Sequence, residues 1–256
     1  QPPPPPPPGM LQALAALFDF DELHIRQKVL TLSQKYDVRD QFDNPRFYVV
    51  RPPRIFLNVL ASGAAGFVRL IILILVIRMF MQQGPAALPV AIPILILTNI
   101  FLGFALVLIA PYRHIEVYSD ESESWRILTI TQDNKLGLFR TYTLYDCLGG
   151  EVARFRRNTL LSIFRRDWRV ETPDGQYDIC RVREDSWVKS LLRRYLGPLY
   201  GLLRTNFLFY YPNGQRAGKY DRKLTLRDQY VLNLHEDAGR SLDRRAALAM
   251  SILLDT

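Results

Sequence analysis

The longest apolar stretch of the chain covers residues 55–110 and is interrupted once, at residues 82–85. Its second half, residues 86–110, contains no charged residue. At about 1.5 Å of rise per residue, a helix of this length crosses the roughly 30 Å hydrocarbon layer of a bilayer. The pattern therefore predicts a two-helix transmembrane hairpin over residues 55–111.

The first half of this stretch carries Arg69 near its centre and Arg78 near its end. An arginine at the middle of a membrane costs about 2.5 to 3.5 kcal/mol, which the many leucine, isoleucine and valine side chains around it offset. Arg78 is close enough to the end to extend its charge towards the interface. A very apolar buried helix pair of a soluble protein is the alternative interpretation.

Basic residues flank the apolar stretch and predict its orientation. Arg46, Arg51 and Arg54 precede it, Arg113 follows it, and the connection near Gln83 carries no charge. Because positively charged flanks stay in the cytoplasm, we expect both termini and the rest of the chain to be cytoplasmic. The sequence thus predicts an integral membrane protein.

Outside the apolar stretch, hydrophobic positions alternate with a period of two, which is typical of strands. Turn-forming pairs such as Asn213-Gly214 separate the segments. Strands are predicted at residues 24–32, 34–39, 46–50, 114–118, 126–131, 138–145, 152–155, 168–172, 177–182, 206–211 and 229–234. Many short strands at this spacing predict a mainly β fold, either a sandwich or a barrel.

A weak internal repeat relates the two sides of the apolar stretch. Residues 36–44 (YDVRDQFDN) align with residues 142–150 (YTLYDCLGG), each a strand that ends in Asp before a turn. If the similarity is not due to chance, the hairpin is an insertion within one β-domain. The expected organisation is a tail (1–22), first strands (23–54), hairpin (55–111) and the remaining strands (112–256).

The C-terminal segment departs from the strand pattern. Ser241 is placed to cap a helix whose residues 246–254 are apolar on nearly all sides. A helix that is apolar all round but too short to span a membrane is expected to be buried, which indicates an all-β domain closed around one apolar helix. A second helix is expected at residues 186–196.

The N-terminal segment has no capacity to form a core. Seven consecutive prolines, residues 2–8, favour an extended polyproline II tail, followed by a short amphipathic segment. The tail is expected either to be solvated or to bind an SH3-like partner.

The net charge of the chain and its cysteine and histidine residues indicate which ligands and activities are expected. The chain has 256 residues and a formal charge of +8, without a nucleic-acid recognition motif, so the surplus suits an anionic lipid surface and not nucleic acid. Cys147 and Cys180 are expected to be reduced thiols. His24, His114 and His235 lie in no zinc or catalytic spacing, and no phosphate-binding loop occurs. We therefore expect no enzyme, no metal and no cofactor.

Basic residues interspersed with aromatic residues form the candidate site. Arginine forks fit phosphate oxygens, so these clusters predict binding of anionic phospholipid head groups, while a solvated barrel face is the alternative. The candidate residues are Arg154, Arg156, Arg157, Arg165, Arg166, Arg169, Arg193, Arg194, Lys219, Arg222 and Lys223.

Three features together resemble a known family: the repeated strand-Asp units, residues 218–223 (GKYDRK) with Asp228 and Tyr230, and residues 242–249 (LDRRAALA). They are similar to the tubby C-terminal-like superfamily, which includes phospholipid scramblases and LURP-one-related proteins. The resemblance implies a twelve-stranded, closed antiparallel barrel around a buried hydrophobic C-terminal helix, which agrees with the interpretation of the residues, so we predict this fold. The inserted hairpin is not part of the family pattern, and an acidic calcium loop is absent from the sequence, so calcium-activated scrambling is not expected.

Three functional hypotheses follow. The first is a membrane-anchored module that binds anionic lipids, and the second is a phospholipid scramblase in which Arg69 marks a polar track. The third is a membrane-tethered scaffold that recruits partners through its proline tail. The sequence leaves the lipid and the oligomeric state open.

Overall fold

The computed structural model describes residues 16–28, 34–51, 55–109, 111–135, 137–159, 162, 166–185, 206–223 and 229–254. The chain divides into two compact units, one formed by Gln1–Pro52 with Arg113–Thr256 and the other by Pro53–Tyr112. The proline tail and the predicted helix at residues 186–196 lie outside the described residues.

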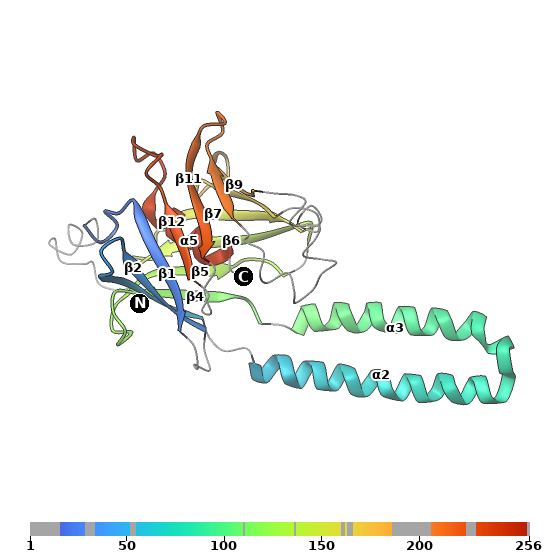
Figure 1. The fold of residues 1–256 in the computed structure, drawn as a ribbon. Helices are drawn as coiled ribbons and strands as arrows, with labels where there is room; N and C mark the ends of the chain where they lie inside the picture. The colour runs from blue at the N-terminus through green and yellow to red at the C-terminus, as the bar shows by residue number, and fades with distance from the viewer. Residues whose placement is uncertain are drawn as a thin grey trace. The chain divides into compact units, whose positions relative to one another are not determined.

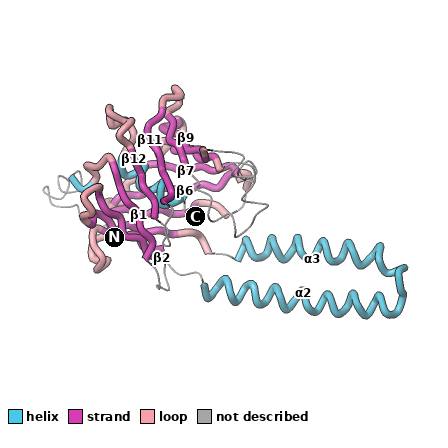
Figure 2. The backbone as a smooth tube through the Cα atoms, in the orientation of Figure 1, coloured by secondary structure: helices cyan, strands magenta, loops and turns pink. Residues whose placement is uncertain are grey.

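The first unit is mainly β. Among the described residues, twelve strands form a closed barrel in which neighbouring strands are antiparallel (Figures 1 and 2). The strands are β1 (Glu22–Lys28), β2 (Gln34–Asp40), β3 (Pro45–Arg51), β4 (His114–Tyr118), β5 (Arg126–Gln132), β6 (Phe139–Asp146), β7 (Glu151–Asn158), β8 (Asp167–Glu171), β9 (Asp178–Glu184), β10 (Phe207–Tyr210), β11 (Arg216–Lys223) and β12 (Gln229–Asn233). The predicted antiparallel barrel is therefore confirmed.

Strands β3 and β4 lie on either side of the apolar stretch in the sequence and are neighbours in the barrel. Tyr48 pairs with Tyr118, and Val50 pairs with Glu116. The chain thus leaves the barrel where β3 ends and re-enters it where β4 begins. We call this end of the barrel the β3–β4 end. Because neighbouring strands are antiparallel, β6 and β8 also begin there, and β5, β7, β9 and β11 end there.

Alternation along each strand builds the core. In β7, Ala153 and Phe155 are fully buried, whereas Arg154 and Arg156 between and beyond them are partly exposed. Side chains at every second position of a strand point to the same face, so the buried set fills the interior. These residues form one hydrophobic cluster with the buried residues of α5 (Arg244–Leu254).

Strand β11 was not predicted, because its alternation is weak and contains Gly218. A Cβ atom at this position would clash with the backbone carbonyl oxygen of Asn233 on β12. Glycine therefore allows β11 and β12 to approach closely. The turn at Asn213-Gly214 was the available signal, since a tight turn requires a returning strand.

The two repeated turns have the same hydrogen bonds. Asp40 and Asp146 each end a strand, and each carboxylate accepts the backbone N–H groups two and four residues later. The pairs are Phe42 and Asn44 to Asp40, both at 2.9 Å, and Leu148 and Gly150 to Asp146, at 2.9 and 2.8 Å. The predicted similarity of the two units is confirmed. A third copy of the backbone turn follows β10, where Tyr211 replaces the aspartate.

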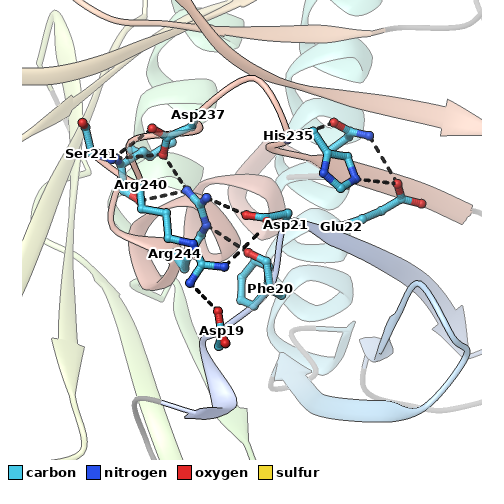
Figure 3. A network of polar contacts seen from close by, with 11 residues as sticks. Asp19, Phe20, Asp21, Glu22, His235, Asp237, Arg240, Ser241 and Arg244 are labelled. Atoms are coloured by element: carbon cyan, nitrogen blue, oxygen red, sulfur yellow. Dashed lines mark hydrogen bonds and ion pairs between the residues drawn. The ribbon is translucent and has the colours of Figure 1, made fainter.

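Arg244 anchors the start of α5 to the N-terminal part of the barrel (Figure 3). Its guanidinium donates to Asp237 at 2.6 Å, to Asp21 at 2.7 Å and to the backbone oxygen of Phe20 at 2.9 Å. The carboxylate of Asp237 also accepts the backbone N–H groups of Ser241 and Leu242, at 2.9 and 3.1 Å. This buried network fixes where the helix begins.

The predicted cap at Ser241 is wrong. The helix is capped by Asp243, whose side-chain oxygen accepts the backbone N–H of Arg245 at 2.8 Å. The backbone oxygen of Asp243 also accepts the N–H of Ala247 at 2.9 Å. An aspartate directly before the first turn satisfies N–H groups that have no partner within the helix.

The second unit is helical. It contains α2 (Ile55–Gln83), the short 3-10 turn η1 (Gly84–Ala87) and α3 (Leu88–Ile109), which form a helical hairpin (Figure 1). By length and composition, the described residues hold one helical segment that is long and apolar enough to cross a membrane, Gly63–Leu106, and 6% of its most apolar window is buried. Arg69 and Arg78 are exposed on α2.

Candidate anion-binding site

At the β3–β4 end of the barrel, the outermost inward-facing position of several strands is an arginine. In β3, Phe47 and Val49 are buried, and Arg51 is the next residue on the same face of the strand. In β7, Ala153 and Phe155 are followed in the same way by Arg157. Since strand side chains alternate between faces, these arginines lie on the interior face where the apolar core stops.

The same alternation applies to four further arginines. Arg113 precedes the buried Ile115, Arg140 precedes Tyr142, Arg166 precedes Trp168, and Arg222 follows Tyr220, each by two residues. We call Arg51, Arg113, Arg140, Arg157, Arg166 and Arg222 the arginine mouth. Among the described residues, Glu184 is a carboxylate at an equivalent position of β9. The mouth therefore carries a surplus of positive charge.

Two of these arginines bind the end of α5. Arg51 donates to the backbone oxygen of Ile252, and Arg166 donates to that of Leu254 at 3.2 Å. The last carbonyl groups of a helix have no partner within the helix and carry partial negative charge. Arg51 also donates to the hydroxyl of Tyr36 at 2.9 Å. These contacts explain why buried arginines are tolerated at this end.

Arg157 is partly buried in the mouth with further arginines close to it. Its Nε donates to the hydroxyl of Ser162 at 2.8 Å, and its guanidinium lies 5.4 Å from the centre of the Trp168 ring. Burial, together with the neighbouring charge of Arg166, lowers the pKa of Arg157 to about 10. The described residues give Arg157 no ion pair with a carboxylate. An anion bound here would relieve this repulsion.

The predicted site residues that the structure describes do not form a single site. Arg157, Arg166 and Arg222 belong to the arginine mouth. Arg154 and Arg156 face outwards on β7 and line a surface pocket. Arg169 lies 3.9 Å from Asp178, and Lys219 lies 3.0 Å from Asp221, as ion pairs outside the mouth. Lys223 is exposed. Arg165, Arg193 and Arg194 lie outside the described residues.

Sequence reasoning missed Arg51, Arg113 and Arg140 as site residues. They are isolated in the sequence, so a search for adjacent basic residues does not find them. Each of these arginines lies two residues from a buried strand residue and therefore on the same face of the strand. This alternation is the signal that could have identified them.

Other candidate chemistry is limited. Cys180 is buried, and burial raises the pKa of its thiol to about 12, so it is not a reactive thiolate. Within the described ranges, no group of three or more His, Cys, Asp or Glu side chains is arranged to hold a metal ion. The chemistry that the described site offers is therefore binding of anions by guanidinium groups.

Comparisons with known proteins add no assignment to this geometry. The chain matches no family model, and the comparisons with curated proteins and with solved structures found no match. The arginine mouth and the apolar segment are therefore the features that indicate a function.

Proposed function

We propose that this chain is a membrane-anchored, non-enzymatic protein whose barrel binds anionic phospholipid head groups at the cytoplasmic face of a membrane. The observation that carries the proposal is the arginine mouth at the barrel end where the chain leaves for the apolar segment. Arg51 ends β3 and Arg113 precedes β4. A phosphate group is the ligand that several converging guanidinium groups recognise best.

Chain connectivity supports a location of the mouth close to lipid. Residues 52–54 and 110–113 are short links between the barrel strands and the helices α2 and α3. If α2 and α3 cross the bilayer as a hairpin, links of this length keep the β3–β4 end near the head groups. Each basic residue near an anionic membrane surface contributes about 1 kcal/mol to binding.

The barrel interior is also part of the proposal. We infer that α5 occupies the centre of the barrel, as the resemblance to the tubby C-terminal-like superfamily implies. The support is that Leu248, Ala249 and Met250 are fully buried in one cluster with inward residues of the strands. In this arrangement α5 places its C-terminal carbonyl groups, and the arginines that bind them, at the mouth.

Head-group binding is tested with the full chain in neutral detergent, titrated with short-chain phosphatidylserine and phosphatidylcholine. Phosphatidylserine is expected to bind more tightly, and its affinity should fall as salt rises. Replacing Arg157 by glutamine should weaken phosphatidylserine binding by about fivefold, which corresponds to about 1 kcal/mol.

The matched control is Arg216→Gln. This variant also removes one positive charge, but at the opposite end of β11. There Arg216 pairs with Glu236 at 3.0 Å. This change should leave the dissociation constant unaltered. Equal binding of the two lipids, or equal losses in both variants, would contradict the proposal.

The predicted topology is tested by cysteine labelling in intact cells, in a chain that carries Cys147→Ser. The remaining Cys180 is buried and should not react. A cysteine at Gln83, beside the turn between α2 and α3, should react with a membrane-impermeant maleimide added outside. A cysteine at Ser119, after β4, should react only after the membrane is permeabilised. External labelling at Ser119 would exclude a cytoplasmic barrel.

A further inference from the structure

A second site lies on the outer wall of the barrel, apart from the arginine mouth. A pocket of about 470 Å³ lies over β6, β7 and β8. Its walls include Phe139 of β6, Arg154 and Arg156 of β7, Glu171 of β8 and Gly175 in the turn after β8. The pocket combines cationic, anionic and aromatic groups within one concave surface, which is typical of small-molecule sites.

The carboxylate of Glu171 is the unusual feature of this pocket. Its side chain is 9% exposed, and none of the described residues donates a hydrogen bond to it. Among the described residues, the nearest cationic atom is Nη1 of Arg156, which lies 3.9 Å away, beyond hydrogen-bond distance. Burial raises the pKa of Glu171, in agreement with this poor compensation. Buried carboxylates normally accept several hydrogen bonds, so Glu171 is placed to accept them from a bound cation.

The two arginines supply the opposite charge. Nη2 of Arg154 donates to Glu151 at 3.0 Å, but its Nε is buried and makes no hydrogen bond. The guanidinium of Arg156 lies over the ring of Phe139, at 3.9 Å from the ring centre, which fixes its plane. Fixed guanidinium groups bind phosphate oxygens with little loss of side-chain freedom.

The geometry points to a small zwitterion as the ligand of this pocket: we propose that it binds an aminoalkyl phosphate, with the ammonium group on Glu171 and the phosphate on Arg154 and Arg156. A lone anion would leave Glu171 uncompensated, and a lone cation would be repelled by the arginines. The site is independent of head-group binding at the arginine mouth, because it uses different residues on the outer face.

The test is a titration of the full chain in neutral detergent with O-phosphoethanolamine, followed by calorimetry. Saturable binding is expected, with inorganic phosphate and ethanolamine each binding at least tenfold more weakly. The Glu171→Gln variant should lose at least tenfold in affinity for O-phosphoethanolamine. Absence of saturable binding, equal binding of inorganic phosphate, or unchanged affinity in Glu171→Gln would overturn the proposal.

A second arm distinguishes a free metabolite from a lipid head group. Short-chain phosphatidylethanolamine should compete with O-phosphoethanolamine if the pocket accepts the head group with its glycerol attached. If the lipid does not compete, the ligand is a free aminoalkyl phosphate. Arg157→Gln should change neither result, so a failure of head-group binding at the mouth is separable from a failure here.

A steric variant keeps the proposal testable if Glu171→Gln fails to fold. A Cβ atom at Gly175 would lie 3.9 Å from Nη1 of Arg154 and from Oε2 of Glu171, so a larger side chain there fills the pocket. Gly175 has a φ of +72°, which asparagine tolerates better than other residues. Gly175→Asn should abolish binding without altering either charge.

The control for the steric variant is Gly214→Asn. Gly214 occupies the equivalent place in the turn after β10, with a φ of +85° and open space around it. It therefore imposes the same backbone strain away from the pocket and should bind O-phosphoethanolamine like the parent. Unchanged binding in Gly175→Asn, or equal loss in both variants, would overturn the assignment.

Discussion

Replacing Ala249 by arginine is expected to prevent the barrel from folding. Ala249 is fully buried in α5, in one cluster with residues of the strands. An arginine there would place a charge without a partner in an apolar interior, at a cost of several kcal/mol. Because domains of this kind are stable by only about 5 to 15 kcal/mol, the loss should be visible as the absence of a cooperative thermal transition.

The matched control adds the same charge at an exposed alanine. Ala16 is exposed near the start of the described residues, and Ala16→Arg should melt like the parent. The measurement is thermal unfolding followed by far-ultraviolet circular dichroism. An Ala249→Arg variant that melts at the parental temperature would show that α5 does not fill the barrel.

Replacing Arg244 by methionine is expected to destabilise the protein by about 3 to 5 kcal/mol, the usual result of removing one partner of a buried ion pair. Methionine retains much of the side-chain volume but leaves the carboxylate of Asp237, which is 2% exposed, without its cation. The free energy of unfolding, measured by denaturant titration, should fall accordingly.

The control for this change is the neighbouring residue. Arg245 is 36% exposed and pairs with Asp243 at 2.7 Å, so Arg245→Met should cost less than about 1 kcal/mol. Adding Asp237→Asn to Arg244→Met should recover part of the loss, since the unpaired charge is then removed. Similar losses in the two single variants would show that the network does not fix the start of α5.

The same network gives the stability a defined pH dependence. Burial alone would raise the pKa of Asp237, but the neighbouring Tyr211 hydroxyl, the Arg244 guanidinium and the backbone N–H of Leu242 outweigh it, so the pKa is lowered. A lowered carboxyl pKa contributes stability above the unfolded value of about 3.9, and that contribution is lost as the pH falls through the folded pKa. This acid sensitivity should be smaller in Asp237→Asn.

The strand pattern and the turns were predictable because they depend on neighbours in the sequence. Buried residues recur at every second position in β4 and β9, which suffices to predict strands. The turns after Asp40 and Asp146 depend on hydrogen bonds that span four residues. Strand β11 was missed because Gly218 serves a contact with another strand, which no local pattern expresses.

The candidate site was only partly predictable for a related reason. Adjacent arginines were grouped as one basic surface, but neighbouring positions in a strand point to opposite faces. Arg156 therefore faces outwards to the pocket, whereas Arg157 faces the mouth. Their chemistry differs accordingly, since one lies beside Glu171 and the other beside further arginines.

A β-domain interrupted by a long apolar helical segment could be predicted from the sequence, because residue periodicity and uninterrupted hydrophobicity are local properties. Which residues that are distant in the sequence contact one another depends on how the strands pair in the folded barrel. The approach of Glu171 to Arg156, and of Arg51 to the end of α5, follows from strand register and barrel closure. These are set by the packing of the whole interior, because a shift of one residue would turn every inward side chain outwards.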